Sequence, residues 1–221
     1  MTHAILILHI AAGFAALLAG GVAIATKKGK GWHVTAGRIY FWSMAGVAGS
    51  ALYLSVVRPN PFLLLISLFS FFLTWSGYRA IHWKNRTLQG PVRWFHRTLV
   101  PLFLLTGCLM VTLGALAWLG ISFHPALERL AAVLFVFGVI FTVLAAAEFR
   151  HMIWPETSGK FWWMYRHIGS MLGAYIATFT AFLVVNNTFL PELVAWVGPT
   201  ALGTPLIAWW TRTWRTKLER A

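Results

Sequence analysis

Apolar runs, each about the length needed to cross a bilayer, occupy most of this chain. A membrane-spanning helix needs about 20 predominantly apolar residues. Runs of this length lie near residues 4–26, 34–57, 61–81, 97–121, 128–148, 164–186 and 188–210. Only 10% of the 221 residues are charged, whereas soluble proteins carry about a quarter. The sequence therefore predicts one all-α domain over residues 1–221, a bundle of seven transmembrane helices.

The cations between these runs predict the orientation of the bundle. Lys and Arg that flank membrane spans stay preferentially on the cytoplasmic side. Of the 18 Lys and Arg residues, only Arg58 and Arg129 fall on the side opposite the basic connection at 27–38, which leaves 16 on the other side. We therefore expect the N-terminus outside and the C-terminus in the cytoplasm.

The net charge of +13 follows from this topology, because cations between apolar segments meet anionic lipid head groups. Membrane lipids are the predicted partners, with further copies of the chain or a larger membrane complex as a second expectation. No nucleic-acid partner is predicted.

Small residues give the first span a packing face. Ala12, Ala16 and Gly20 recur at a spacing of four, which permits close approach to a neighbouring helix. His9 lies on nearly the same face and should point into the protein. A hydrogen bond from His9 to a neighbouring helix is favoured over a ligand role.

The last span contains three prolines, Pro191, Pro199 and Pro205. Proline removes a backbone donor and clashes with the preceding turn, so we expect a kinked or broken helix. Broken helices often border a binding cavity in membrane proteins.

Three histidines stand where helices begin, at similar depths near the predicted cytoplasmic interface. They are His33, His96 and His167, and they are candidate haem or metal ligands because imidazole ligates both. The candidate binding residues at the same interface are Arg38, Tyr40, Arg79, Glu148 and Arg166. Arginine there would bind haem propionates, a quinone head or a lipid phosphate.

The common metallohydrolase patterns are absent from the sequence. The chain has one cysteine, Cys108, no Asp and no HEXXH pattern, so neither an intrachain disulfide nor a common metallohydrolase site is expected.

Three segments of the first 80 residues form a recognisable pattern: a basic loop followed by HVTAGRIY, the NPFLLL opening of the third span and its GYR ending. Through this pattern the chain resembles a family of bacterial membrane proteins known as a domain of unknown function. The matching residues are His9, Gly13, His33, Gly37, Arg38, Tyr40 and Arg79. This resemblance implies a multi-pass protein of the bacterial inner membrane and implies no activity.

Three functions fit these residues. The favoured one is binding of a redox cofactor, haem b or quinone, or of an anionic small molecule, in a cytoplasmic pocket of histidine and arginine. A transporter of a small anionic or lipid-like solute is the first alternative, because of the prolines and the basic interface. A non-catalytic subunit or assembly factor of a membrane complex is the second. No particular reaction is indicated.

Overall fold

The computed structural model of the chain describes residues 2–82, 90–154 and 160–219, and these residues form helices and connections without a strand. The helices are α1 (Thr2–Ala25), α2 (Trp32–Val57), α3 (Pro61–His82), α4 (Gly90–Trp118), α5 (Pro125–Arg129), α6 (Ala131–Ile153), α7 (Trp162–Asn186) and α8 (Glu192–Glu219). All except the short α5 are long and apolar enough to cross a membrane. The predicted bundle of seven spans is therefore confirmed.

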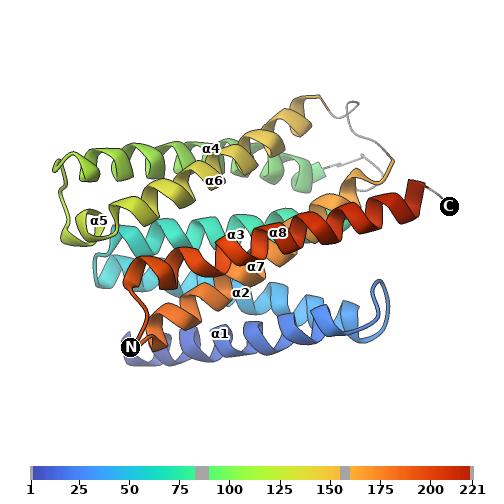
Figure 1. Cartoon of the computed structure of the whole chain (residues 1–221), viewed down its shortest axis with the longest axis horizontal. Helices are drawn as coiled ribbons and strands as arrows, with labels where there is room; N and C mark the ends of the chain where they lie inside the picture. Colours follow the sequence, from blue (N-terminus) through green and yellow to red (C-terminus); the bar gives the residue numbers. More distant parts are fainter. Residues whose placement is uncertain (1, 83–89, 155–159, 220–221) are drawn as a thin grey trace.

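The seven spans alternate in direction, so the chain has two distinct ends (Figure 1). The α1–α2 connection, the ends of α3 and α6, the starts of α4 and α7 and the C-terminus lie at one end, which we call the basic end. The N-terminus and α5 lie at the opposite end. Arg58 and Arg129 belong to the opposite end, as the charge pattern requires. The side of the membrane that each end faces stays a prediction.

The helices pack as two groups. One group contains α4, α5 and α6, and we call it the α4–α6 group; the five-helix group contains α1, α2, α3, α7 and α8. Backbones approach closely within each group and much less between them, which Figure 1 shows as a separate α4–α6 layer. Glycine makes the α4–α6 contact close: a Cβ on Gly107 would lie 2.8 Å from the backbone nitrogen of Thr142, and one on Gly114 2.7 Å from that of Phe135. Side chains are therefore excluded from both positions.

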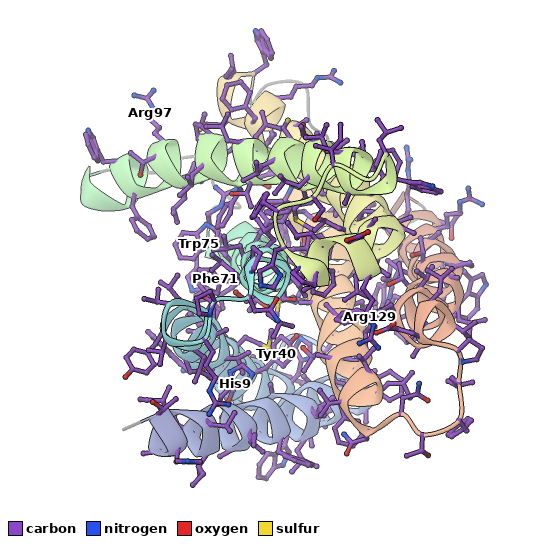
Figure 2. All side chains as sticks on the ribbon, turned by 90° about the vertical axis from the view of Figure 1, so that its left-hand side faces the viewer. His9, Tyr40, Phe71, Trp75, Arg97 and Arg129 are labelled. Atoms are coloured by element: carbon purple, nitrogen blue, oxygen red, sulfur yellow. The ribbon has the colours of Figure 1, made fainter. Side chains whose placement is uncertain are left out.

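Within the five-helix group, α2 and α7 pack against the small-residue face of α1. Ala16 is buried, and a Cβ on Gly20 would lie 2.4 Å from the ring of Tyr175. His9 Nδ1 lies 2.9 Å from Ser50 Oγ on α2, and Figure 2 shows His9 between α1 and α2. The predictions of a packing face and of a hydrogen-bonded His9 are confirmed.

Aromatic rings fill the boundary between the two groups near the middle of the bundle. Phe69 and Phe72 of α3 meet Phe137 and Phe141 of α6, with ring centres 5.6 Å apart for Phe69 and Phe137 and 5.0 Å for Phe72 and Phe141. Phe103 of α4 joins them, 5.2 Å from Phe72. Such pairs add to the free energy of burial, and here they hold α3 against the α4–α6 group.

The structure corrects the last predicted span, 188–210. α8 is one continuous helix that begins at Glu192, after Pro191, and runs to Glu219, with Pro199 and Pro205 inside it. The predicted break is wrong because each proline removes only one donor while the remaining helical bonds persist, as membrane helices tolerate.

Two other predicted boundaries also differ. The span predicted at 97–121 is α4, which begins at Gly90 and ends at Trp118, because its helix continues beyond the apolar run. The span predicted at 128–148 is α6, which begins at Ala131 and continues to Ile153. The separate helix α5 precedes it, where His124 Nδ1 accepts a hydrogen bond from the nitrogen of Ala126 and caps the helix.

Candidate functional site

One buried carboxylate joins the two helix groups at the basic end. Glu148 of α6 forms ion pairs with Arg79 of α3 and with Arg166 of α7. Its Oε2 also accepts a hydrogen bond of 3.0 Å from Ser76 Oγ. Glu148 is 2% exposed, Arg79 4% and Arg166 20%. One negative charge is thus shared by two guanidinium groups in a largely dry environment.

Helical spacing brings these groups together. Glu148 follows Phe141 and Ala145 on the buried face of α6, at offsets of seven and three residues. Ser76 and Arg79 are three residues apart on α3, so both side chains leave the same face. The buried face of α6 is therefore apolar in the middle of the helix and carries a charged side chain near the basic end.

His96 extends the network into α4. Its Nε2 lies 3.1 Å from Arg79 Nη1 and accepts the hydrogen bond, because arginine only donates. The side chain is 1% exposed. This nitrogen is therefore engaged in a helix–helix contact, and a metal ion on it would have to displace Arg79.

His33 and His167, the other two candidate ligands, lie beside each other. Their ring centres are 6.3 Å apart with planes at 84°. His33 Nδ1 lies 2.9 Å from the carbonyl oxygen of Ala23, and His167 Nδ1 lies 2.9 Å from that of Gly77. Since a carbonyl can only accept, each Nδ1 carries a proton, and in the neutral imidazole the lone pair is then on Nε2.

Lys28, like His33, donates hydrogen bonds to backbone carbonyls at the end of α1. Lys28 Nζ donates to the carbonyl oxygens of Ala23 and Thr26, each at 3.1 Å, and to that of Ile24. Partial burial lowers the pKa of Lys28. His33 and Lys28 together satisfy the C-terminal turn of α1.

Tyr40 is a core residue of the five-helix group. It is 2% exposed, and its hydroxyl donates to Thr178 Oγ1 at 3.1 Å, because Thr178 uses its own proton on the carbonyl of Ala174. Figure 2 shows Tyr40 inside the bundle.

Arg38 lies apart from these residues. It is exposed, and it stands two residues from both Ala36 and Tyr40, which are buried, so it leaves α2 on the opposite face. The structure thus joins Arg79, His96, Glu148 and Arg166 directly, and leaves Arg38 out of this network.

A cavity of about 970 Å³ begins beside the shared carboxylate. It lies between α6 of one group and α3, α7 and α8 of the other, and runs from the basic end towards the middle of the bundle. Phe69, Phe72, Phe137, Ile140 and Leu144 form its deep apolar part. Its residues at the basic end include Lys160, Trp162, Tyr165, Arg166 and Arg215.

Of the predicted binding residues, Arg166 alone is among those that line this cavity, and Arg79 and Glu148 act beside it. Ser76, Lys160 and Arg215 also line it and were missed from the sequence. Ser76 had one usable signal, since it lies one turn before Arg79 on the same helix face. Lys160 and Arg215 had none beyond their charge.

Within residues 2–82, 90–154 and 160–219, no three His, Cys, Asp or Glu side chains group into a metal site.

Comparison with known proteins supports the family resemblance for the first part of the chain. Residues 6–98 match a family described as "Predicted membrane protein (DUF2306)". This stretch covers α1, α2, α3 and the start of α4, less than half of the chain, and it ends before Glu148 and Arg166. Neither a curated protein nor a solved structure matches the chain.

Proposed function

We propose that the protein binds one amphiphile with an anionic head group, such as a phosphate-headed lipid. The observation that carries this proposal is the polarity of the cavity. Its basic-end lining includes Lys160, Arg166 and Arg215, and its deep part is aromatic and aliphatic. A ligand that fits both parts has a negative head and an apolar body.

Arg166 is the residue best placed to hold the head group. Guanidinium presents five N–H donors in a fork that matches phosphate and carboxylate oxygens. One Arg166 nitrogen pairs with Glu148, a carboxylate that also serves Arg79. A ligand anion would supply the second negative charge that two guanidinium groups favour.

The dimensions support a lipid-like body. The lining on α7 extends from Trp162 to Ala177, which corresponds to about 22 Å at 1.5 Å per residue. The hydrocarbon core of a bilayer is about 30 Å thick, so the cavity is long enough for a chain from one leaflet. Its volume of about 970 Å³ lies within the range of small-molecule sites.

The basic end faces the cytoplasm in this proposal, because cations near membrane spans stay on that side. The ligand then comes from the cytoplasmic leaflet of a bacterial inner membrane. α6 and α8 border the cavity from different sides and hardly touch each other, which favours entry from the bilayer.

A lipid-binding experiment tests the proposal. The ligand is a dioleoyl lipid with a phosphate monoester head, and native mass spectrometry in neutral detergent measures its binding. Gly169 lines the cavity, and a Cβ there meets nothing within 4 Å. Gly169→Phe should therefore place a ring in the cavity beside the head-group residues and strongly weaken binding. Lys160→Gln should weaken binding by removing a cation at the head group.

The matched controls are Gly49→Phe and Lys27→Gln. Gly49 also has open space at its Cβ but faces outward from α2, and Lys27 is exposed at the basic end away from the cavity. Both variants should bind the lipid as the wild type does. Equal binding by Gly169→Phe and Gly49→Phe would refute the proposed site.

A two-histidine cofactor site is the second candidate function, favoured by the geometry of His33 and His167. A metal–imidazole bond is about 2 Å long, so two imidazoles on opposite sides of one ion have ring centres about 6 Å apart. The observed separation is 6.3 Å. Binding of haem iron or copper through the two Nε2 atoms is consistent with this spacing and is tested below by absorbance.

A further inference from the structure

The cavity lies on the boundary between the α4–α6 group and the five-helix group, and that position suggests more than binding. We propose that the two groups move relative to each other as two bodies, and that this motion carries the amphiphile from the leaflet at the basic end to the opposite leaflet. The inference rests on the proposed function, since the cargo is the same ligand.

Close backbone contacts support the division into two bodies. A Cβ on Gly138 of α6 would lie 2.7 Å from the backbone nitrogen of Val111 on α4. In the other group, a Cβ on Gly77 of α3 would lie 3.0 Å from the nitrogen of Met171 on α7. Among the described glycines, every such close approach to another helix stays within one group. Packing without side chains between backbones makes each group stiff.

Contacts across the boundary are of a different kind. In the middle they are edge and tilted ring contacts, such as Phe72 with Phe103 and Phe69 with Phe141, at ring-centre distances of 5.2 Å in both pairs. Rings in edge or tilted contact tolerate small rotations, because their attraction is spread over many atom pairs. The middle of the boundary is therefore suited to act as a pivot.

Each end of the boundary also has an ion pair between the groups. At the basic end Glu148 of the α4–α6 group pairs with Arg79 and Arg166 of the five-helix group, beside the cavity. At the opposite end Arg129 of α5 pairs with Glu192 of α8, with 2.9 Å between Nε and Oε2.

The two pairs differ in burial. The carboxylate at the basic end is 2% exposed, whereas Arg129 and Glu192 are 73% and 40% exposed, and Figure 2 shows Arg129 at the near end of the bundle beside α8. An exposed pair contributes little and breaks readily. The ionic contact at the opposite end is therefore the weaker of the two, so the motion opens that end, where the packing of α5 and its buried Leu127 on α3 must also separate. The cavity, already lined by cations at the basic end, then connects both leaflets.

Translocation in vesicles tests the motion. The vesicles contain an acyl-labelled phosphate-headed lipid whose label an impermeant reductant bleaches only in the outer leaflet. The variant carries Arg129→Cys and Glu192→Cys in a Cys108→Ser background, because Cys108 is exposed and free. A short bis-maleimide with a reducible spacer then fixes the two groups at the opposite end.

We expect the cross-linked protein to bind the lipid in detergent, to lose translocation and to regain it when the spacer is reduced. The matched control cross-links Phe14→Cys of α1 to Phe182→Cys of α7 in the same background. Both side chains are exposed, and their ring centres lie 5.7 Å apart within the five-helix group, so this link should leave translocation unchanged.

The outcomes separate the two proposals. Wild type that binds the lipid but does not translocate it overturns the transport inference and leaves the binding function standing. Undiminished translocation by the protein cross-linked between positions 129 and 192 overturns the inference too, as does an equal loss in the Phe14–Phe182 control. Absence of lipid binding overturns both proposals.

Discussion

Replacing Glu148 with glutamine should destabilise the protein more than any other single change in its network. Glutamine keeps the shape and the Ser76 hydrogen bond but removes the charge that Arg79 and Arg166 share. Leaving a buried charge without its partner costs about 3–5 kcal/mol. Because two guanidinium groups lose their partner here, we expect the upper part of that range.

The neighbouring substitutions should cost less, since each leaves the carboxylate paired. Arg79→Gln keeps Glu148 with Arg166 and Ser76, so the loss is a hydrogen bond to a charged group, about 1.5–3 kcal/mol. Ser76→Ala leaves both arginines on Glu148, and we expect about 1.5 kcal/mol. The predicted order of destabilisation is therefore Glu148→Gln, then Arg79→Gln, then Ser76→Ala.

Unfolding by sodium dodecyl sulfate in mixed micelles, followed through the fluorescence of the 13 tryptophans, measures these differences. The double variant with Glu148→Gln and Arg79→Gln gives the sharpest comparison. In this double variant one guanidinium group, that of Arg166, has lost its carboxylate instead of two, so the protein should be more stable than Glu148→Gln alone. Additive losses in the double variant, or a Glu148→Gln protein as stable as Ser76→Ala, would refute the shared-charge reasoning.

Three further predictions concern the topology, the helix packing and the haem hypothesis. Reporters fused after Lys30 and at the C-terminus should both report the cytoplasm, and opposite reports would contradict the predicted orientation. Gly107→Leu should destabilise the protein by about 1–3 kcal/mol, because a side chain there meets the α6 backbone, whereas Gly49→Leu should not; unfolding in mixed micelles compares them. The haem hypothesis requires a Soret band that disappears when His33 and His167 are both replaced by alanine, and colourless wild type refutes it.

The spans were predictable because their signal is local. About 20 consecutive apolar residues specify a membrane helix whatever it packs against, and the spacing of Ala16 and Gly20 specified the packed face of α1. For α8 the prolines predicted a kinked or broken helix, and the break was wrong. Pro199 and Pro205 each remove one donor, but the rest of the helix hydrogen bonds remain, so the helix continues.

The sequence predicted how deep in the membrane the candidate site residues lie, but not towards which neighbouring helix each side chain points. Helical rise placed Arg38, Arg79 and Arg166 near one interface, yet only rotation about each helix decides which of them meet. For Arg38 the signal was present: at 100° per residue it lies about 200° from Tyr40, whose face is buried. For Glu148 it was absent, because its Ser76 partner lies 72 residues away and no local pattern specifies that contact.

The unequal ends of the boundary determine which motion the protein favours. Separating the groups at the basic end would break the buried contacts of Glu148, at a cost of about 3–5 kcal/mol. Separating them at the opposite end breaks the exposed Arg129–Glu192 pair, which contributes about 0–1 kcal/mol. It also exposes part of the buried Leu127 where α5 packs on α3, at a cost of up to about 1.5–3 kcal/mol. The ionic contacts therefore oppose motion less at the opposite end, and the groups stay joined around Glu148. A head group on Arg166 would thus remain next to a fixed ionic centre while its path to the other leaflet opens.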